Sequence, residues 1–434
     1  MNFNVIKLNI ISKINLIFII IFSSSCFFTG SLPAASLIQL DDTELSEVNG
    51  QALMSLSYIA PVDSANKMQG ESIGFYKLGL EADLELNANI KKLQLGCGGV
   101  NGAGSCDIDF DNLSLSGVGD TRDGRAGSSA KLTNPFIEFA IKNPNSSSTR
   151  EVVGLRLSAE KALGMLTVGT ENSATPNGIN SLSGYMKIKD TTGLGYTAPR
   201  DMGYSDTGKS INGKVLPTIL GLPTLPVDFS SKNYNLQLQE TTAPIFIQGA
   251  TILGNRMNTV QLTGYADINQ INFSGDLTAR VLGLINLQKK VTGNITGLKA
   301  DITVNQNLGY IHKINLNNPF SLSLQNNTVW WPNADAAAQR GWWMAFDDEI
   351  DIGNVYPTKK IDITDGVLKQ IVDPISEFLQ RYPVKCGAVN CFFGSNLDVG
   401  NVHLPKAPVN FPLKDLQLRN QDFAPNCFGT LKFC

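Results

Sequence analysis

The sequence predicts a mainly β protein with an elongated, antiparallel sheet or sandwich-like architecture, long strands, one C-terminal amphipathic helix and a disulfide-stapled tail. Three observations predict this fold class. Apolar residues recur at every second position in many runs, which is the period of a half-buried strand. One stretch near the C-terminus has a helical period instead, and six cysteines form sequence-local pairs. The polar residues between the apolar ones favour antiparallel sheets with one wet face over parallel sheets buried on both faces.

The composition is typical of an exported β protein. The 434 residues carry a formal net charge of −3, and 17% of them are charged, against about 25% in an average soluble domain. No basic patch offers an electrostatic footprint for nucleic acid, and no polybasic segment suits anionic lipid. We therefore expect no nucleic-acid partner.

The N-terminus has the parts of a secretory signal peptide. Lys7 and Lys13 precede an apolar run over residues 14–22, and small residues follow up to Ser36. This run is shorter than the ~20 residues that span a membrane, which favours cleavage over a retained anchor. Cys26 raises the alternative of a lipoprotein, but the leucine expected before it is missing. We expect residues 1–36 to be the signal peptide and the only membrane contact, and export to the periplasm, outer membrane or cell surface.

Three regions follow the signal peptide. Residues 37–214 form an N-terminal β-rich region with a short leading helix, which Asp41 or Asp42 caps and Asn49-Gly50 ends. Residues 215–361 form a second β-rich region, and residues 362–434 hold the C-terminal helix and the stapled tail. Three prolines within 215–229, which a central strand does not accommodate, predict a crossover or a domain seam there.

A long hairpin is the clearest element of the first region. Residues 78–90 alternate strictly between apolar and small or polar side chains, which predicts one strand of roughly 40 Å. The phase changes at Lys91-Lys92, so a bulge or bend is expected there. A glycine-rich loop then leads from Cys97 to Cys106, and a second alternating run follows over residues 108–115.

The cysteines predict three local disulfides. Without Cys26 the mature chain has six cysteines, which allow 15 pairings. Their spacing contains no CxxC motif for a metal or redox site, so structural bonds are expected between Cys97 and Cys106, Cys386 and Cys391, and Cys427 and Cys434.

Further strands are expected wherever apolar residues alternate, with turn residues between them. These apolar faces are Ile137, Phe139 and Ile141; Val153, Leu155 and Leu157; Leu182 to Ile188; Ile271 to Val281; Leu298 to Val304; and Phe320, Leu322 and Leu324. The helix is expected over Asp365 to Arg381, where Leu368, Ile371, Val372, Ile375, Phe378 and Leu379 form a stripe. Pro374 is expected to kink this helix and Pro383 to end it.

Several segments resemble a known protein family. They are residues 40–61, 74–80, 88–104 and 131–144, which include the sequences Leu-Ser-Glu-Val-Asn-Gly-Gln-Ala and Leu-Gly-Cys-Gly-Gly-Val-Asn-Gly-Ala-Gly. In these residues the chain is similar to the FilA-type pilus assembly proteins of Gram-negative bacteria, over most of its mature length. The resemblance implies a role in a pilus or other surface fibre, and it implies no catalytic residues.

Residues that could carry chemistry do not form a recognisable active site. The spacing of the aspartates in Asp107 to Asn112 is similar to the start of a calcium-binding EF-hand loop. However, Asn112 and Val118 occupy the sixth and twelfth positions, where an EF-hand has glycine and glutamate. The acidic residues of Asp347 to Asp351 have no specific spacing. His312 and His403 lie outside any zinc-ligand or catalytic motif, and no nucleotide-binding or nucleophile motif occurs. We expect no enzyme, no metal site and no cofactor.

All four tryptophans, Trp330, Trp331, Trp342 and Trp343, lie close together in the sequence. Tryptophan combines a large apolar surface with one N–H donor, so these residues are a candidate interface or sugar platform. The alternative is a local hydrophobic cluster that closes the Pro332–Gly341 loop.

The leading function is a non-enzymatic envelope protein that serves the assembly, structure or adhesion of a pilus or fimbrium. Its expected partners are other fibre proteins or outer-membrane assembly proteins, which could pair with exposed strand edges. The alternative is a periplasmic or outer-membrane carrier of an apolar, lipid-like ligand, which an all-apolar concave face would favour. An enzyme acting on envelope polymers is the least supported reading.

Overall fold

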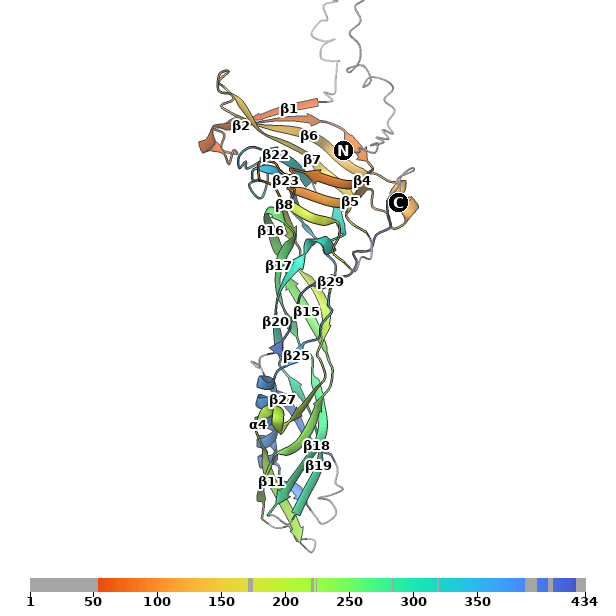
Figure 1. The fold of residues 1–434 in the computed structure, drawn as a ribbon, viewed down its shortest axis with the longest axis vertical. Coiled ribbons are helices and arrows are strands. Elements are labelled where there is room, and N and C mark those ends of the chain that lie inside the picture. Colours follow the sequence, from red (N-terminus) through yellow and green to blue (C-terminus); the bar gives the residue numbers. More distant parts are fainter. Residues whose placement is uncertain are drawn as a thin grey trace, which may run out of the picture.

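The computed structural model describes residues 54–170, 175–219, 222–223, 225–282, 285–317, 320–386, 396–404 and 409–426. These residues are mainly β, as predicted, and most strand pairs are antiparallel. Figure 1 shows a broad head of strands above a long, narrow stalk, so the expected elongated shape is confirmed. The predicted signal peptide and short leading helix lie outside the described residues.

The head is built on a 12-stranded sheet. It contains strands from three separate parts of the chain: β1 (Met54–Ile59), β2 (Ile73–Leu80), β3 (Asp83–Leu86), β4 (Ala88–Leu95), β5 (Ile108–Ser116), β6 (Ala130–Lys142), β7 (Glu151–Thr167), β8 (Ile179–Ile188), β16 (Ala250–Met257), β21 (Lys313–Leu316), β22 (Phe320–Gln325) and β23 (Gly341–Ile350). A short helix, α2 (Arg122–Ala126), connects β5 to β6, and a single-turn helix, η1 (Gln69–Glu71), precedes β2.

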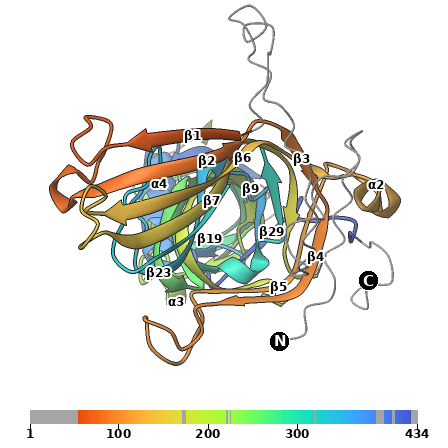
Figure 2. The ribbon, with the colours of Figure 1, turned by 90° about the horizontal axis from the view of Figure 1, so that it is seen from above.

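Five strands of the head close into a ring. β7 pairs with β22, the pairing continues through β23 and β8 to β5, and β5 pairs with β7 again. Apolar side chains of these strands, including Phe110, Leu182 and Phe346, belong to the main hydrophobic core. Strands β1, β2 and β6 continue outward from β7 and are referred to as the wing (Figure 2).

The disulfide-closed hairpin forms as predicted. β4 pairs antiparallel with β5, and Cys97 is bonded to Cys106. Asn112, with a left-handed φ of 48°, interrupts the ladder near Lys91, where the phase change was expected. The described residues hold no second disulfide; Cys391, Cys427 and Cys434 lie outside them, and so do both predicted C-terminal disulfides.

The expected single strand over residues 78–90 is wrong, because the chain divides it among β2, β3 and β4. β2 and β3 both pair with β6, on either side of Asn134, which has a left-handed φ of 49°. Opposite Asn134, the chain leaves the strand conformation at Glu81 and Ala82, which separates β2 from β3. After Asn87 the chain leaves β6 and pairs with β5 instead.

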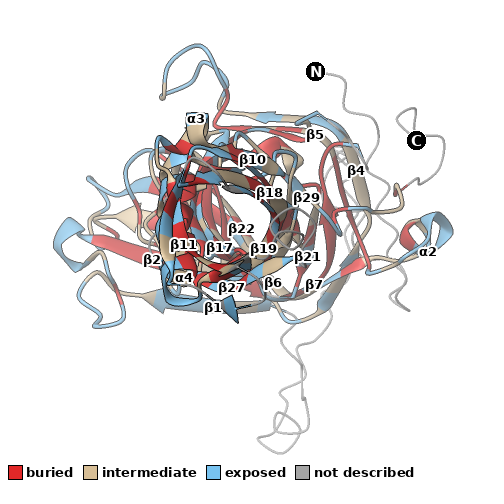
Figure 3. Ribbon diagram, turned by 90° about the horizontal axis from the view of Figure 1, so that it is seen from below, coloured by how far each residue is buried: buried red, intermediate tan, exposed pale blue. Residues whose placement is uncertain are grey.

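The stalk consists of smaller sheets around the continuation of the same core. Its strands are β9 (Thr191–Tyr196), β10 (Arg200–Gly203), β11 (Ile211–Ile219), β12 (Leu222–Pro223), β13 (Val227–Ser231), β14 (Asn233–Leu238), β15 (Thr242–Gln248), β17 (Thr259–Asp267), β18 (Ile271–Val281), β19 (Ile285–Thr296), β20 (Lys299–Asn307), β24 (Val355–Pro357), β25 (Asp362–Ile363), β26 (Val384–Cys386), β27 (Leu397–His403), β28 (Val409–Asn410) and β29 (Leu416–Leu418). Two short helices, α3 (Tyr204–Thr207) and η2 (Leu308–Tyr310), connect strands. Seen from below, buried residues run along the strands that enclose the centre of the molecule (Figure 3).

The predicted alternation holds in the stalk. On β18, Ile271, Phe273 and Leu277 are buried, while the residues between them are exposed or half-buried. On β20 the buried set is Ala300, Ile302, Val304 and Gln306. Here one face of each strand packs on the core and the other is solvated, as the sequence pattern predicts.

The predicted helix is confirmed with its expected bounds as α4 (Asp365–Arg381). It packs against β11 and β27, and it buries five of the six residues of its predicted stripe, namely Leu368, Ile371, Val372, Ile375 and Leu379. Burial of each such side chain stabilises the stalk by about 1.5–3 kcal/mol. In the part of the chain that the structure describes, no helix has the length and apolar character needed to span a membrane.

The proline-containing segment 215–229 is not a crossover. β11 runs through Pro217, and β13 turns back antiparallel to it at the far end of the stalk. β13 pairs only with residues 211–215, so Pro217 lies beyond the end of that ladder and its missing N–H costs no bond to β13. β26 pairs in parallel with residues 215–217. The division into head and stalk does not coincide with a boundary at residue 215. The head sheet contains β1 to β8, which precede this residue, and also β16, β21, β22 and β23, which follow it.

The described C-terminal residues return from the stalk to the head. Arg125, fully buried, donates to the hydroxyls of Ser114, Ser116 and Thr167 and to the carbonyl of Ala424. Burial lowers the pKa of this guanidinium to about 10. The side chain of Asn426 donates to Asn87. These bonds attach the segment that contains Ala424 and Asn426 to the head.

His312 makes this attachment sensitive to pH. It is 4% exposed, its Nδ1 lies 3.1 Å from the carbonyl oxygen of Val168, and its backbone N–H donates to Gln421. Burial lowers the pKa of His312 below its ordinary value of 6.5. Because the unfolded chain therefore binds a proton more readily than the folded one, the free energy of unfolding falls as the pH drops below about 6.5, by at most about 1.4 kcal/mol per pH unit.

We expect wild-type protein to lose more stability between pH 7.5 and pH 5.5 than the His312→Gln variant, in urea unfolding at both values. The glutamine amide can still donate to Val168, but it does not titrate. Equal losses in the two proteins would contradict this role of His312.

Candidate binding site on the head

Two rows of apolar side chains cross six strands of the head on one face. Residues directly opposite each other on neighbouring strands project to the same side of a sheet. The first row consists of Leu56, Leu78, Ile137, Leu157, Leu322 and Met344, and the second of Tyr58, Tyr76, Phe139, Leu155, Leu324 and Trp342. They are referred to together as the apolar face.

Much of the apolar face is exposed. In the first row Met344 is 5% exposed and Leu78 and Leu322 are half-buried, whereas Ile137 is 39%, Leu157 is 44% and Leu56 is 75% exposed. Exposed apolar surface costs about 25 cal/mol per Å² relative to burial. Soluble monomers rarely expose a large contiguous apolar patch, and such patches mark binding surfaces.

The opposite face of the same strands is buried although it is more polar. Ser321, Ser323 and Gln325 of β22 are all buried, and so is Glu138 of β6. Residues 326–340, referred to as the Trp loop, cover this face with Trp331 and its neighbours. The sequence predicted the reverse, with the apolar residues of β6 and β22 turned to the core.

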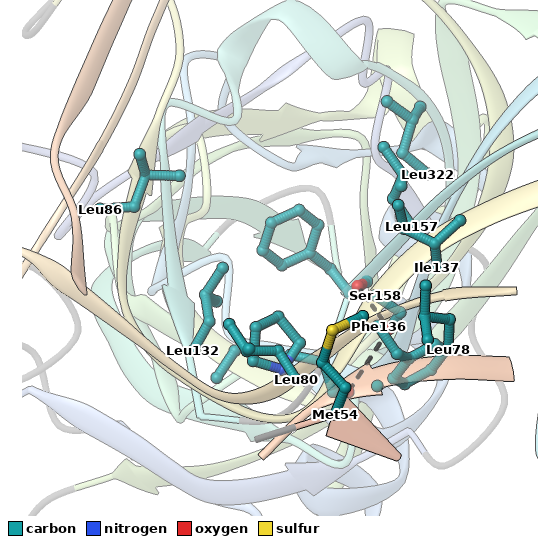
Figure 4. Close-up of a pocket in the computed structure, with 15 residues that line it drawn as sticks. Met54, Leu78, Leu80, Leu86, Leu132, Phe136, Ile137, Leu157, Ser158 and Leu322 are labelled. Atoms are coloured by element: carbon teal, nitrogen blue, oxygen red, sulfur yellow. Dashed lines mark hydrogen bonds between the residues drawn. The ribbon is translucent and has the colours of Figure 1, made fainter. Parts of the chain in front are cut away.

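A groove lies on the apolar face, where the wing meets β7, β22 and β3. Its volume is about 450 Å³, which is in the range of ligand sites. Figure 4 shows its labelled side chains gathered around the hollow. The lining residues are Met54, Leu78, Gly79, Leu80, Leu86, Leu132, Pro135, Phe136, Ile137, Leu157, Ser158, Ala159, Ala162, Phe320 and Leu322.

The groove exists because β6 and β7 change face and carry small side chains there. Asn134, in its left-handed conformation, donates to Glu160 of β7 at 2.9 Å. On β7 the inward side chains next to this point are Ala159 and Ala162, which leave space that larger residues would fill. Gly79 lets β1 approach, since a Cβ at this position would lie 2.7 Å from Ser55 Oγ.

The groove is suited to binding and not to acid–base chemistry. None of its fifteen lining residues has a titratable side chain, and the hydroxyl of Ser158 already donates to the carbonyl of Phe320. The groove can therefore hold apolar groups, while specificity for a polar group would have to come from backbone atoms.

The main path of strands through the head sheet ends in two edge strands of different character, while β3, β16 and β21 each pair with one strand beside this path. Among the described residues, β1 pairs only with β2, and β4 pairs only with β5. The edge strand β4 carries Lys91 and Lys92, and lysines on an edge discourage pairing with another chain. β1, with the sequence Met-Ser-Leu-Ser-Tyr-Ile, has no charged side chain and no proline.

The four tryptophans do not form one surface platform. Trp331 and Trp343 are each 2% exposed and belong to the cluster under the Trp loop. Trp330 is half-buried, with the Lys67 ammonium 4.4 Å from its ring centre, and Trp342 is half-buried at the end of the second apolar row. These positions support the alternative of a local cluster for Trp331 and Trp343.

The other candidate residues are scattered. Asp107 is buried and bound to Arg256, whereas Asp109 and Asp111 form ion pairs with Lys92. His312 and His403 lie on different elements, in the head and in β27 of the stalk. Across the described residues, no group of three or more His, Cys, Asp or Glu side chains is placed to hold a metal ion.

Comparison of the chain with models of known protein families, with curated proteins and with solved structures finds no match. The functional argument for the head therefore depends on its residues and geometry. Part of the site had a sequence signal, because Ile137 and Phe139, Leu155 and Leu157, and Leu322 and Leu324 were predicted as apolar faces. Nothing in the sequence indicated that these residues would be exposed, and the sequence analysis did not identify β1 as an apolar face.

Proposed function

We propose that this protein is a non-enzymatic, exported component of the bacterial envelope that takes part in the assembly or structure of a pilus or similar surface fibre. The observation that carries the proposal is the uncharged edge strand β1 beside the apolar face, at one end of an elongated molecule. An extended segment of another chain can add to such an edge, with main-chain hydrogen bonds for affinity and side-chain pockets for specificity.

The chemistry of the head supports binding over catalysis. The apolar face continues to the open edge of the sheet, and the exposed Leu56 and Tyr58 of β1 would contact an added strand first. The N-terminal signal sequence and the resemblance to pilus assembly proteins support export and a fibre system. Adhesion is a related role that the same surface could serve.

Fractionation of native cells tests this proposal. We expect an antibody to recover the protein with fibres sheared from the cell surface, and we expect Leu56→Lys to reduce that recovery at least fivefold, because the lysine charge opposes addition of a strand to β1. Leu163→Lys is the matched control, since Leu163 is 55% exposed on the same head but does not line the groove. Recovery of wild-type protein only in the periplasm would contradict a place in the fibre.

A second candidate function is transport of an apolar, lipid-like ligand, which the groove of about 450 Å³ favours. In that case lipid should copurify with the protein. We expect Leu157→Glu to lose the bound lipid in native mass spectrometry, because the carboxylate would be desolvated beside an acyl chain. Wild-type protein purified without any bound lipid would remove this alternative.

A further inference from the structure

The edge strand β1 is complementary to a second copy of itself. We infer that two heads pair through β1, antiparallel about a two-fold axis at Leu56, into a dimer with one continuous sheet. This inference deepens the proposed function, because it names the partner of the same edge, and it rests on that edge being used for binding.

The register of this pairing follows from the pattern of β1. An axis at Leu56 sets Leu56 opposite its own copy, so the first apolar row continues from one head into the other. It also sets Tyr58, at the end of the second row, opposite the apolar side chain of Met54. On the other face each Ser55 meets Ser57 of the second copy, and serine hydroxyls can hydrogen-bond across strands. The strand has no charge to repel its copy, and a two-fold interface brings the same surface patch from both subunits together.

Other occupants of the edge fit less well. The segment before β1 contains Asp41, Asp42, Glu44 and Glu47. If it folded back at Asn49-Gly50 along β1, it would set Thr43 opposite Leu56 and Asp41 opposite Tyr58, which places a carboxylate against the apolar face. The strand at the other end of the main path, β4, presents Lys91 and Lys92, so β1 would meet charged side chains there.

Sedimentation and cysteine cross-linking of the exported, full-length protein test the inference. Directly opposite residues of antiparallel strands have Cα atoms about 4.5–5.5 Å apart, which is within the usual range of a disulfide. We expect wild-type protein to sediment as a concentration-dependent dimer, and we expect L56C to form a covalent dimer under mild oxidation. L163C, at another exposed apolar position of the head, should stay at the wild-type level of cross-linking.

The matching loss-of-function variant is L56K, which should weaken dimerisation at least tenfold while its circular dichroism and melting temperature stay those of wild type. A wild-type monomer at all concentrations, or a dimer that L56K does not weaken, would overturn the inference. Open-ended oligomers would overturn the two-fold arrangement and indicate pairing of β1 with a different edge strand. A monomer that is still recovered with sheared fibres would refute the inference alone, and a dimer that never reaches fibres would refute the proposed function alone.

Discussion

Replacing Arg156 by methionine is expected to lower the free energy of unfolding by about 3–5 kcal/mol, the usual cost of removing one partner of a buried ion pair. Arg156 is 6% exposed, its Nε donates to Glu138 at 2.9 Å, and its Nη2 donates to the carbonyl of Pro332 at 3.0 Å. Its guanidinium also lies 5.3 Å from the ring centre of Trp331. The residue therefore links β6, β7 and the Trp loop.

The effect should be large because Glu138 stays behind. Burial already raises the pKa of Glu138, and Arg156 is the main group that opposes this shift. The Glu138→Gln/Arg156→Met double variant removes the carboxylate as well and should be more stable than Arg156→Met alone. Urea unfolding followed by tryptophan fluorescence measures both. A loss below about 1 kcal/mol for Arg156→Met would place this pair among weak surface ion pairs.

Replacing Asp107 by alanine is expected to cost a similar 3–5 kcal/mol. Asp107 is 1% exposed and accepts hydrogen bonds from Arg256 Nε at 3.0 Å, from Asn101 at 2.9 Å and from the backbone N–H of Trp342 at 3.0 Å. It thus joins the disulfide-closed hairpin to β23 and to β16, the strand that leads into the stalk. Arg256 has a left-handed φ of 51°, which side-chain-bearing residues rarely adopt, and loss of Asp107 removes one of its supports.

Asp109→Ala is the matched control for Asp107→Ala. Asp109 lies two residues further on, in β5, but its ion pair with Lys92 is near the surface, where such pairs contribute about 0–1 kcal/mol. Trypsin should cut after Arg256 faster in Asp107→Ala than in wild type or in Asp109→Ala. Equal unfolding free energies of the two alanine variants would show that burial of the Asp107 pair has no special effect.

The sequence predicted the elements that depend on local pattern. The stripe of α4 and the alternation of β18 and β20 each have one face on the core, so the pattern and the burial agree. The Cys97–Cys106 hairpin was equally readable, because its strands and its bond are close in the sequence. The prediction of one strand from Leu78 to Ile90 was wrong. The alternation of these residues does not show that Asn134, about 50 residues away, interrupts the strand with which they pair.

The candidate site shows why the burial of the head strands could not be predicted from the sequence. Alternation identifies two faces of a strand, but it does not say which face other elements will cover. In β6 and β22 the Trp loop covers the polar face, and the Glu138–Arg156 pair satisfies charges there. The apolar residues Ile137 and Leu324 are therefore left 39% exposed. This reversal depends on contacts between segments more than 150 residues apart, such as Arg156 and Pro332.

Site-specific photo-cross-linking in native cells tests most directly whether the apolar face is an occupied binding surface. A photoreactive amino acid is placed at Leu56 in one strain and at Leu163 in a control strain. The account predicts a discrete adduct from position 56, to a second copy or to a fibre protein, and none from position 163. No adduct from position 56, or the same adducts from both positions, would contradict it.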